Sequence, residues 1–144
     1  MRVALYQCPP LPLDVAGNLH RLHQLALEAK GADLLVVPEM FLTGYNIGLD
    51  AVSVLAEVHN GESAQQIARI AKSAGIAILY GYPERTEDGQ IYNSVQLIDA
   101  HGERMCNYRK THLFCDLDHS MFNAGANDFP LVELNGWKLG FLIC

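Results

Sequence analysis

Three residues of different chemical kinds each follow an apolar, strand-like segment. In open α/β sheets, ligands bind just beyond the carboxyl ends of the strands. The pattern therefore predicts that the fold brings together a carboxylate, an ammonium group and a thiol. They are Glu39 after residues 33–38, Lys110 after residues 104–109, and Cys144 after residues 137–143.

The three side chains match the needs of nucleophilic acyl transfer. A thiol needs a base to become a thiolate, and a positive group can stabilise the developing oxyanion. Glu39 can supply the base and Lys110 the positive charge, with no histidine required. Taken singly, Cys144 could be a small buried hydrophobe and Lys110 a surface lysine. Glu39 is harder to explain structurally, because a carboxylate after an apolar strand is costly to bury unpaired.

Other chemistry has weaker support. His20 and His23 lie three apart on an expected helix and could share a metal, but such a pair more often belongs to a solvated face. His112 or His119 could activate Cys115 as in papain-like enzymes, although a loop thiol is more often incidental. No phosphate-binding glycine pattern follows any strand. We therefore expect neither a metal nor a cofactor.

Composition sets the protein class. The chain has 144 residues, of which 50% are hydrophobic and 18% charged, as in one globular domain. Its net charge of −6 gives no reason to expect a nucleic-acid or membrane partner. The apolar run after Met1 is too short for a secretory signal or a membrane span, which predicts a cytoplasmic protein. Free thiols are expected, since the spacing of the four cysteines is not of the zinc or redox kind.

Hydrophobic patterns predict the elements that position these residues. Strands are expected at 2–7, 33–38, 76–80, 91–98, 104–109, 129–134 and 137–143. A helix is expected at 18–30, extended backwards by Val15 and ended by Gly31. A second helix should start at a capping box of Ser63 and Gln66 and end at Gly75. Residues 50–58 suit a helical turn or two, and residues 111–128 a polar loop.

Two strand–helix–strand units come early in the chain, which predicts parallel pairing there. Two hairpins come late, one at residues 99–103 and one at Asn135-Gly136. The fold class is therefore α/β with a mixed sheet. About seven strands but only two firm helices leave one sheet face without its helices, so we expect the front part of a larger domain.

Three segments resemble the carbon–nitrogen hydrolase (nitrilase) superfamily. They are residues 37–45 (VPEMFLTGY), 108–114 (YRKTHLF) and 140–144 (GFLIC). The resemblance implies Glu39 as general base, Lys110 as oxyanion stabiliser and Cys144 as nucleophile. It also implies an α-β-β-α sandwich with mixed sheets, and a homo-oligomer when complete. The chain is most similar to bacterial amidases of small aliphatic amides, including the 5-aminopentanamidase type.

The sequence departs from this family in two places. Members commonly carry a second glutamate in the loop after the lysine, where this chain has Asp118 and no glutamate. Either Asp118 takes a similar positioning role or none is needed; Asp118 and Tyr45 are also candidates for the substrate pocket. The family continues past the cysteine into a turn and helix whose first N–H helps form the oxyanion hole, whereas this sequence ends at Cys144. Residues 1–144 are therefore expected to be an incomplete N-terminal portion of the domain.

The expected function is hydrolysis of a small aliphatic amide through a thioester, with release of ammonia. One alternative is an N-carbamoyl hydrolase that uses the same three residues. Another is a truncated or assembly fragment without catalysis. The chain by itself is expected to be inactive and poorly soluble.

Overall fold

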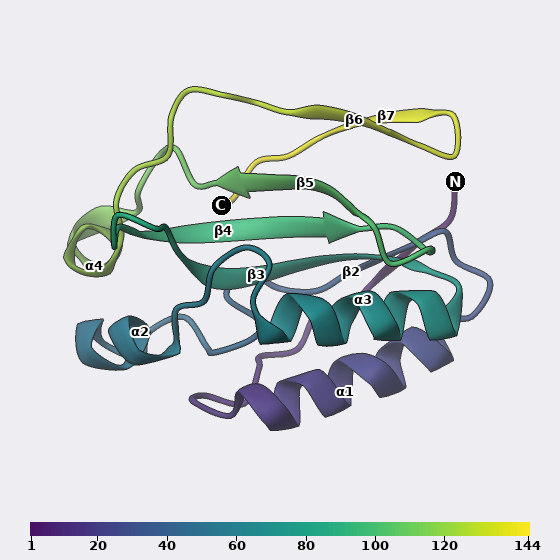
Figure 1. The fold of residues 1–144 in the computed structure, drawn as a ribbon, viewed down its shortest axis with the longest axis horizontal. Coiled ribbons are helices and arrows are strands. Elements are labelled where there is room, and N and C mark those ends of the chain that lie inside the picture. Colours follow the sequence, from purple (N-terminus) through teal and green to yellow (C-terminus); the bar gives the residue numbers. More distant parts are fainter.

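A five-stranded sheet forms the centre of the molecule, with its strands in the order β1-β2-β3-β4-β5 (Figure 1). The computed structural model describes residues 1–144. Strand β2 pairs in parallel with both β1 and β3, whereas β3–β4 and β4–β5 are antiparallel. The predicted mixed sheet, parallel early and antiparallel late, is confirmed. Its strands are β1 (Val3–Leu5), β2 (Leu34–Val36), β3 (Ala77–Arg85), β4 (Ile91–Ile98) and β5 (Arg104–Arg109).

Helices α1 (Val15–Glu28) and α3 (Glu62–Ala74) cover one face of this sheet (Figure 1). Their apolar stripes join the sheet in a cluster of 14 buried residues, the largest of the core. Helix α1 begins at Val15 because the Asp14 side chain accepts the Gly17 N–H at 2.8 Å. It ends at Glu28, two residues before the predicted end.

The start of α3 differs from the expected capping box. The N-cap is Gly61, and Ser63 lies inside the helix. The carboxylate of Glu57 accepts the Ser63 N–H at 2.9 Å and the Ser63 hydroxyl at 2.6 Å. The cap therefore comes from outside the helix, a contact that a local pattern cannot reveal. The predicted end is confirmed, because Gly75 has the left-handed conformation with φ 67°.

Two short helices lie together at one end of the sheet (Figure 1). Helix α2 (Leu49–Leu55) falls where a helical turn or two was expected. Helix α4 (Cys115–Met121) corrects the prediction of a polar loop at 111–128. Met121 of α4 packs in one apolar cluster with Val52 of α2. Only this tertiary contact distinguishes the segment from a loop, since most of its other residues are polar.

A hairpin covers the other face of the sheet (Figure 1). Its strands β6 (Leu131–Leu134) and β7 (Trp137–Gly140) are joined by Asn135 and Gly136, whose φ angles are 51° and 78°. This is the predicted two-residue turn. The hairpin is a separate two-stranded sheet, and it packs on the central sheet through a second buried cluster. The layers are therefore helix, sheet and hairpin, which correspond to three layers of the expected α-β-β-α sandwich.

Strand β3 runs five residues beyond its predicted end at Tyr80 and contains Pro83. The carbonyl of Pro83 accepts the Glu57 N–H at 3.1 Å, on the side away from β4. Because the N and C=O of a strand residue point to the same side, the missing N–H of Pro83 removes no bond to β4. None of the four helices has the length and apolar composition needed to cross a membrane.

Candidate active site

The fold brings Glu39 and Lys110 together although they are 71 residues apart. Glu39 follows β2 and Lys110 follows β5. Both strands run in the same direction as β3, one through parallel pairing and the other through two antiparallel pairings. Their carboxyl ends therefore meet at the same end of the sheet. Lys110 Nζ lies 2.8 Å from Glu39 Oε1.

The backbone at Glu39 turns sharply against β3. Met40 has a φ of 52°, in the left-handed region, and the N–H of Leu42 donates to the carbonyl of Gly81 at 3.2 Å. A Cβ atom at Gly81 would lie 2.4 Å from the Met40 nitrogen, so only glycine allows this approach. The turn that carries Glu39 therefore packs directly against the central strand β3.

Lys110 is fixed at its backbone and at its ammonium group. Its N–H donates to the carbonyl of Asn93 at 2.8 Å, and its own carbonyl accepts the Gly125 N–H at 2.8 Å. Its side chain is 1% exposed, and Nζ lies 2.7 Å from Asp118 Oδ2. The ammonium group therefore sits between the carboxylates of Glu39 and Asp118.

Asp118 is fully buried on α4, and its carboxylate accepts hydrogen bonds from three groups. Besides Lys110, it accepts the Phe114 N–H at 2.8 Å and the Tyr45 hydroxyl at 2.6 Å. The Tyr45 ring centroid lies 5.6 Å from Lys110 Nζ. Tyr45 and Asp118, both candidates for the pocket from the sequence, are thus joined to each other and to Lys110.

Ionisation of this cluster follows from its contacts. Burial alone would raise the pKa of Asp118, but the hydrogen bonds from Lys110, Tyr45 and Phe114 outweigh it, and the pKa is lowered. Burial would likewise lower the pKa of Lys110, but Asp118 and Glu39 raise it. Burial and the bond to Asp118 raise the pKa of the Tyr45 hydroxyl. Lys110 is therefore an ammonium ion and Asp118 a carboxylate at neutral pH.

Cys144 is placed differently from the prediction. The expected buried strand at 137–143 ends at Gly140. In the segment that follows, Phe141 and Ile143 are buried whereas Leu142 is 74% exposed, so the segment is buried on one face only. Cys144 is exposed, has a φ of 69° and makes no hydrogen bond to Glu39 or Lys110. In Figure 1 this segment runs toward the end of the sheet where β5 ends.

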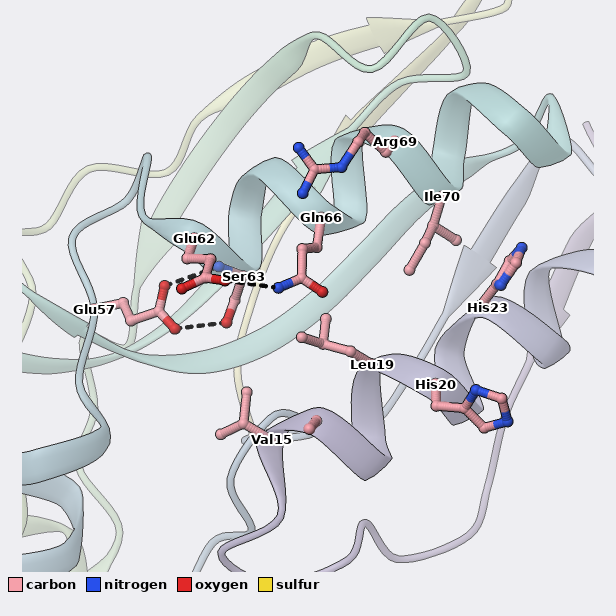
Figure 2. A pocket seen from close by; sticks show the side chains of 11 residues that line it. Val15, Leu19, His20, His23, Glu57, Glu62, Ser63, Gln66, Arg69 and Ile70 are labelled. Carbon is pink, nitrogen blue, oxygen red and sulfur yellow. Dashed lines mark hydrogen bonds between the residues drawn. The ribbon is translucent and has the colours of Figure 1, made fainter.

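The weaker candidates from the sequence do not come together in a second site. All four cysteines are free, and no hydrogen bond joins His112 or His119 to Cys115. His20 and His23 line a groove of about 570 Å³ between α1 and α3, on the helical side of the sheet. Figure 2 shows both imidazoles at the opposite end of this groove from the bonded pair Glu57 and Ser63. No group of three or more potential metal ligands is present.

Asn93 is a site residue that the sequence analysis missed. It lies on β4, is fully buried, and donates through Nδ2 to Glu39 Oε1 at 2.7 Å. The signal was an amide in a strand with apolar ends, since a buried polar side chain needs a partner. The partner could not be identified, because Glu39 is 54 residues away.

The cluster can act as a base beside a fixed positive charge. Oε1 of Glu39 accepts two hydrogen bonds, from Lys110 and Asn93, and Oε2 accepts none. The side chain of Glu39 is 28% exposed. A proton on a nearby reactant can therefore reach a free carboxylate oxygen, while Lys110 supplies positive charge next to it.

The chain matches a known protein family over nearly its whole length. The family described as carbon-nitrogen hydrolase matches residues 2–144. A protein of Pseudomonas protegens, described as the hydrolase in the pqqF 5′ region, is 78% identical over the whole chain, which covers 50% of that protein. An (R)-stereoselective amidase from Pseudomonas sp. is 34% identical over the whole chain and 51% of its own length. The chain thus spans about half the length of these relatives.

The fold also matches solved structures. An amidase from Nesterenkonia sp. superposes with a TM-score of 0.82 and 29% identity, over 100% of this chain and 55% of the amidase. A glutamate-to-glutamine variant of the amidase from Nesterenkonia sp. AN1 shows acrylamide added at its active site cysteine. That variant has a TM-score of 0.82 and 28% identity, over 100% of this chain and 57% of its own.

Proposed function

Because the chain belongs to the carbon–nitrogen hydrolase family, we propose that the protein hydrolyses the non-peptide C–N bond of a small aliphatic amide. The observation that carries this proposal is the contact between Glu39 and Lys110, which leaves one carboxylate oxygen free beside a buried ammonium group. Amidases among the relatives and the cysteine adduct of the Nesterenkonia enzyme support the reaction class.

In this mechanism, the Cys144 sulfur attacks the carbonyl carbon while Oε2 of Glu39 takes the thiol proton. Lys110 stabilises the oxyanion of the tetrahedral intermediate. The C–N bond then breaks, Glu39 returns the proton to the leaving nitrogen, ammonia departs and a thioester remains. Glu39 next takes a proton from water, which attacks the thioester and releases the acid and the thiol. The mechanism requires the exposed Cys144 thiol to come within reach of Glu39.

Asp118 acts in this proposal as the positioning group that family members commonly supply with a second glutamate. It is fully buried and holds Lys110 Nζ at 2.7 Å from the side opposite Glu39. Tyr45 in turn holds Asp118, so that the ammonium group has one fixed position. Fixed charge of this kind needs no reorganisation during the reaction.

The test is ammonia release by the full-length natural protein, measured on short aliphatic amides and on N-carbamoyl compounds. A fusion of residues 1–144 to the second half of the Pseudomonas protegens relative provides a second form of the protein for the same assay. Cys144→Ala should reduce turnover by several orders of magnitude, on the order of 10⁴-fold or more, because the nucleophile is lost. Cys115→Ala, at another exposed thiol, should retain it.

Two outcomes would change the proposal. Turnover by Cys144→Ala near the level of the unmodified protein would remove Cys144 from the mechanism. Hydrolysis of N-carbamoyl compounds but not of amides would favour the carbamoyl hydrolase, which uses the same residues. As part of the proposal we expect a cytoplasmic homo-oligomer without cofactor or metal, which light scattering and elemental analysis of the purified protein can check.

A further inference from the structure

We infer that Asn93 is a positioning residue that holds Glu39 in the orientation required of a general base. The inference deepens the proposed function and rests on it. Asn93 belongs to β4, whereas Glu39 follows β2, so their contact crosses the central strand β3. The Asn93 amide donates to Glu39 Oε1 at 2.7 Å, the same oxygen that Lys110 Nζ contacts at 2.8 Å.

The two donors form a rigid pair. The backbone N–H of Lys110 donates to the carbonyl of Asn93, so the two residues extend the β4–β5 ladder as neighbours. Their side chains both reach Glu39 from the hairpin side of the sheet. Two fixed donors on Oε1 define the plane of the carboxylate and leave Oε2 without a hydrogen bond. Asn93 thereby decides which oxygen of Glu39 is free to accept a proton.

The surroundings of Asn93 indicate that its side-chain N–H is required for the contact with Glu39. Asn93 is fully buried, yet its Oδ1 has no hydrogen-bond partner. An unpaired buried acceptor costs free energy, so an apolar side chain of similar size would suit stability better. The reversed amide would place Oδ1 against the carboxylate of Glu39. The observed orientation therefore leaves Oδ1 unpaired and keeps the hydrogen bond from the amide N–H to Glu39.

The other charged groups near Glu39 act on it through Lys110. The ammonium group comes from the end of β5, Asp118 reaches it from α4, and the Tyr45 hydroxyl donates to Asp118 from the loop after β2. None of these contacts involves the Asn93 side chain. Loss of the Asn93 donor should thus loosen the orientation of the Glu39 carboxylate without removing the positive charge beside it.

The test uses the full-length protein with Asn93→Asp, which keeps the size of the side chain, and Asn93→Ala. The matched control is Ser94→Ala, at the next residue of β4. Ser94 is also fully buried, but its hydroxyl donates to Glu84, on the opposite face of the sheet. Circular dichroism selects the folded variants before assay.

Both Asn93 variants should lower kcat on the order of 100-fold, as expected when a catalytic group is misplaced, with a far smaller change in KM. Ser94→Ala should leave kcat and KM near those of the unmodified protein. A second readout is the NMR chemical shift of the Glu39 carboxyl carbon at neutral pH, which needs no substrate and should change in both Asn93 variants.

The outcomes separate this inference from the proposed function. Unchanged kcat in folded Asn93 variants would overturn the positioning role. Equal effects of Ser94→Ala would do the same, because they would show a general effect of the strand. If the protein hydrolyses no amide but the NMR signal of the Glu39 carboxyl carbon moves only in the Asn93 variants, the proposed reaction is wrong and the positioning contact stands.

Discussion

At the scale of residues, the site is a buried cation held between two carboxylates. Lys110 is 1% exposed, Asp118 is fully buried and Glu39 is partly exposed. Burying such charges is costly, and the cost is offset only while each partner is present. The cluster should therefore respond strongly to any change that removes or displaces one charge.

Lys110→Arg should be severely impaired although the charge is kept. The ammonium group contacts Asp118 at 2.7 Å and Glu39 at 2.8 Å, and a longer planar guanidinium cannot occupy the same point. We expect kcat to fall on the order of 10²–10³-fold, the usual cost of losing one oxyanion donor. Steady-state kinetics on an amide substrate measure it, with Lys138→Arg on the exposed hairpin as control. Near-normal activity would mean that Lys110 only balances the charge of Glu39.

Asp118→Asn should change how stability depends on pH. The pKa of Asp118 is lowered in the folded state, so its contribution is present above about 3.9, the usual value in unfolded chains, and is lost as pH falls through the folded value. The variant has no carboxylate at this position that acid could protonate. Its unfolding free energy should therefore fall less steeply below about pH 4 than that of the wild type. At pH 7 it should be less stable by about 3 kcal/mol, because Lys110 loses a partner.

Urea unfolding at a series of pH values measures both effects. Asp116→Asn, at an exposed position of the same helix, should follow the wild-type curve. Equal slopes in Asp118→Asn and the wild type would show that Asp118 does not contribute to acid sensitivity. Glu84 remains as a second acid-sensitive group, because burial, which would raise its pKa, is outweighed by hydrogen bonds from Arg109, Ser94 and Asn107.

At the scale of elements, the start of α3 depends on a residue outside the helix. Glu57 accepts hydrogen bonds from both the N–H and the hydroxyl of Ser63. Gln66, the residue that a capping box would use, reaches only Glu62, at 3.3 Å. A carboxylate at a helix start satisfies an unpaired N–H and interacts favourably with the helix dipole.

Glu57→Ala should therefore lower the unfolding free energy by about 1 kcal/mol, as for the loss of a helix cap. Gln66→Ala should change it by less than about 0.5 kcal/mol, as is usual at surface positions. Denaturant unfolding of the two variants decides between the capping box and the Glu57 cap. A larger loss of unfolding free energy in Gln66→Ala than in Glu57→Ala would support the predicted capping box instead.

At the scale of the whole molecule, the hairpin segment exposes three large apolar side chains. Leu131 is 74% exposed, Trp137 is 56% exposed and Leu142 is 74% exposed, and all three lie in the β6–β7 hairpin or just after it. The inner side of the same segment packs on the central sheet. Large exposed apolar groups favour association.

The 144-residue chain should accordingly self-associate in solution. Leu131→Lys combined with Leu142→Lys should shift it toward the monomer, because two charged groups then replace two exposed apolar ones. Light scattering over a concentration series measures the mass. Val54→Lys on α2, at a residue that is 82% exposed, is the control and should leave the association unchanged. A monomeric wild-type chain would contradict the prediction.

Features that depend on neighbouring residues could be predicted from the sequence. The bounds of β4 and β5 agree with the predicted strands, and Asn135-Gly136 forms the predicted turn. The positions of Glu39 and Lys110 after apolar strands also followed from the sequence, because strand patterns repeat every two residues and end at recognisable breaks. The resemblance of three segments to a known family was likewise visible in the sequence.

Contacts between distant groups could not be predicted, because they depend on how the strands and helices pack. Asn93 and Lys110 reach Glu39 across 54 and 71 residues of sequence, and Asp118 reaches Lys110 from a helix that reads as a polar loop. The burial of the segment before Cys144 on one face depends on the sheet beneath the hairpin. Hydrophobic periodicity records which face of an element is buried, whereas the identity of a partner depends on strand order and direction.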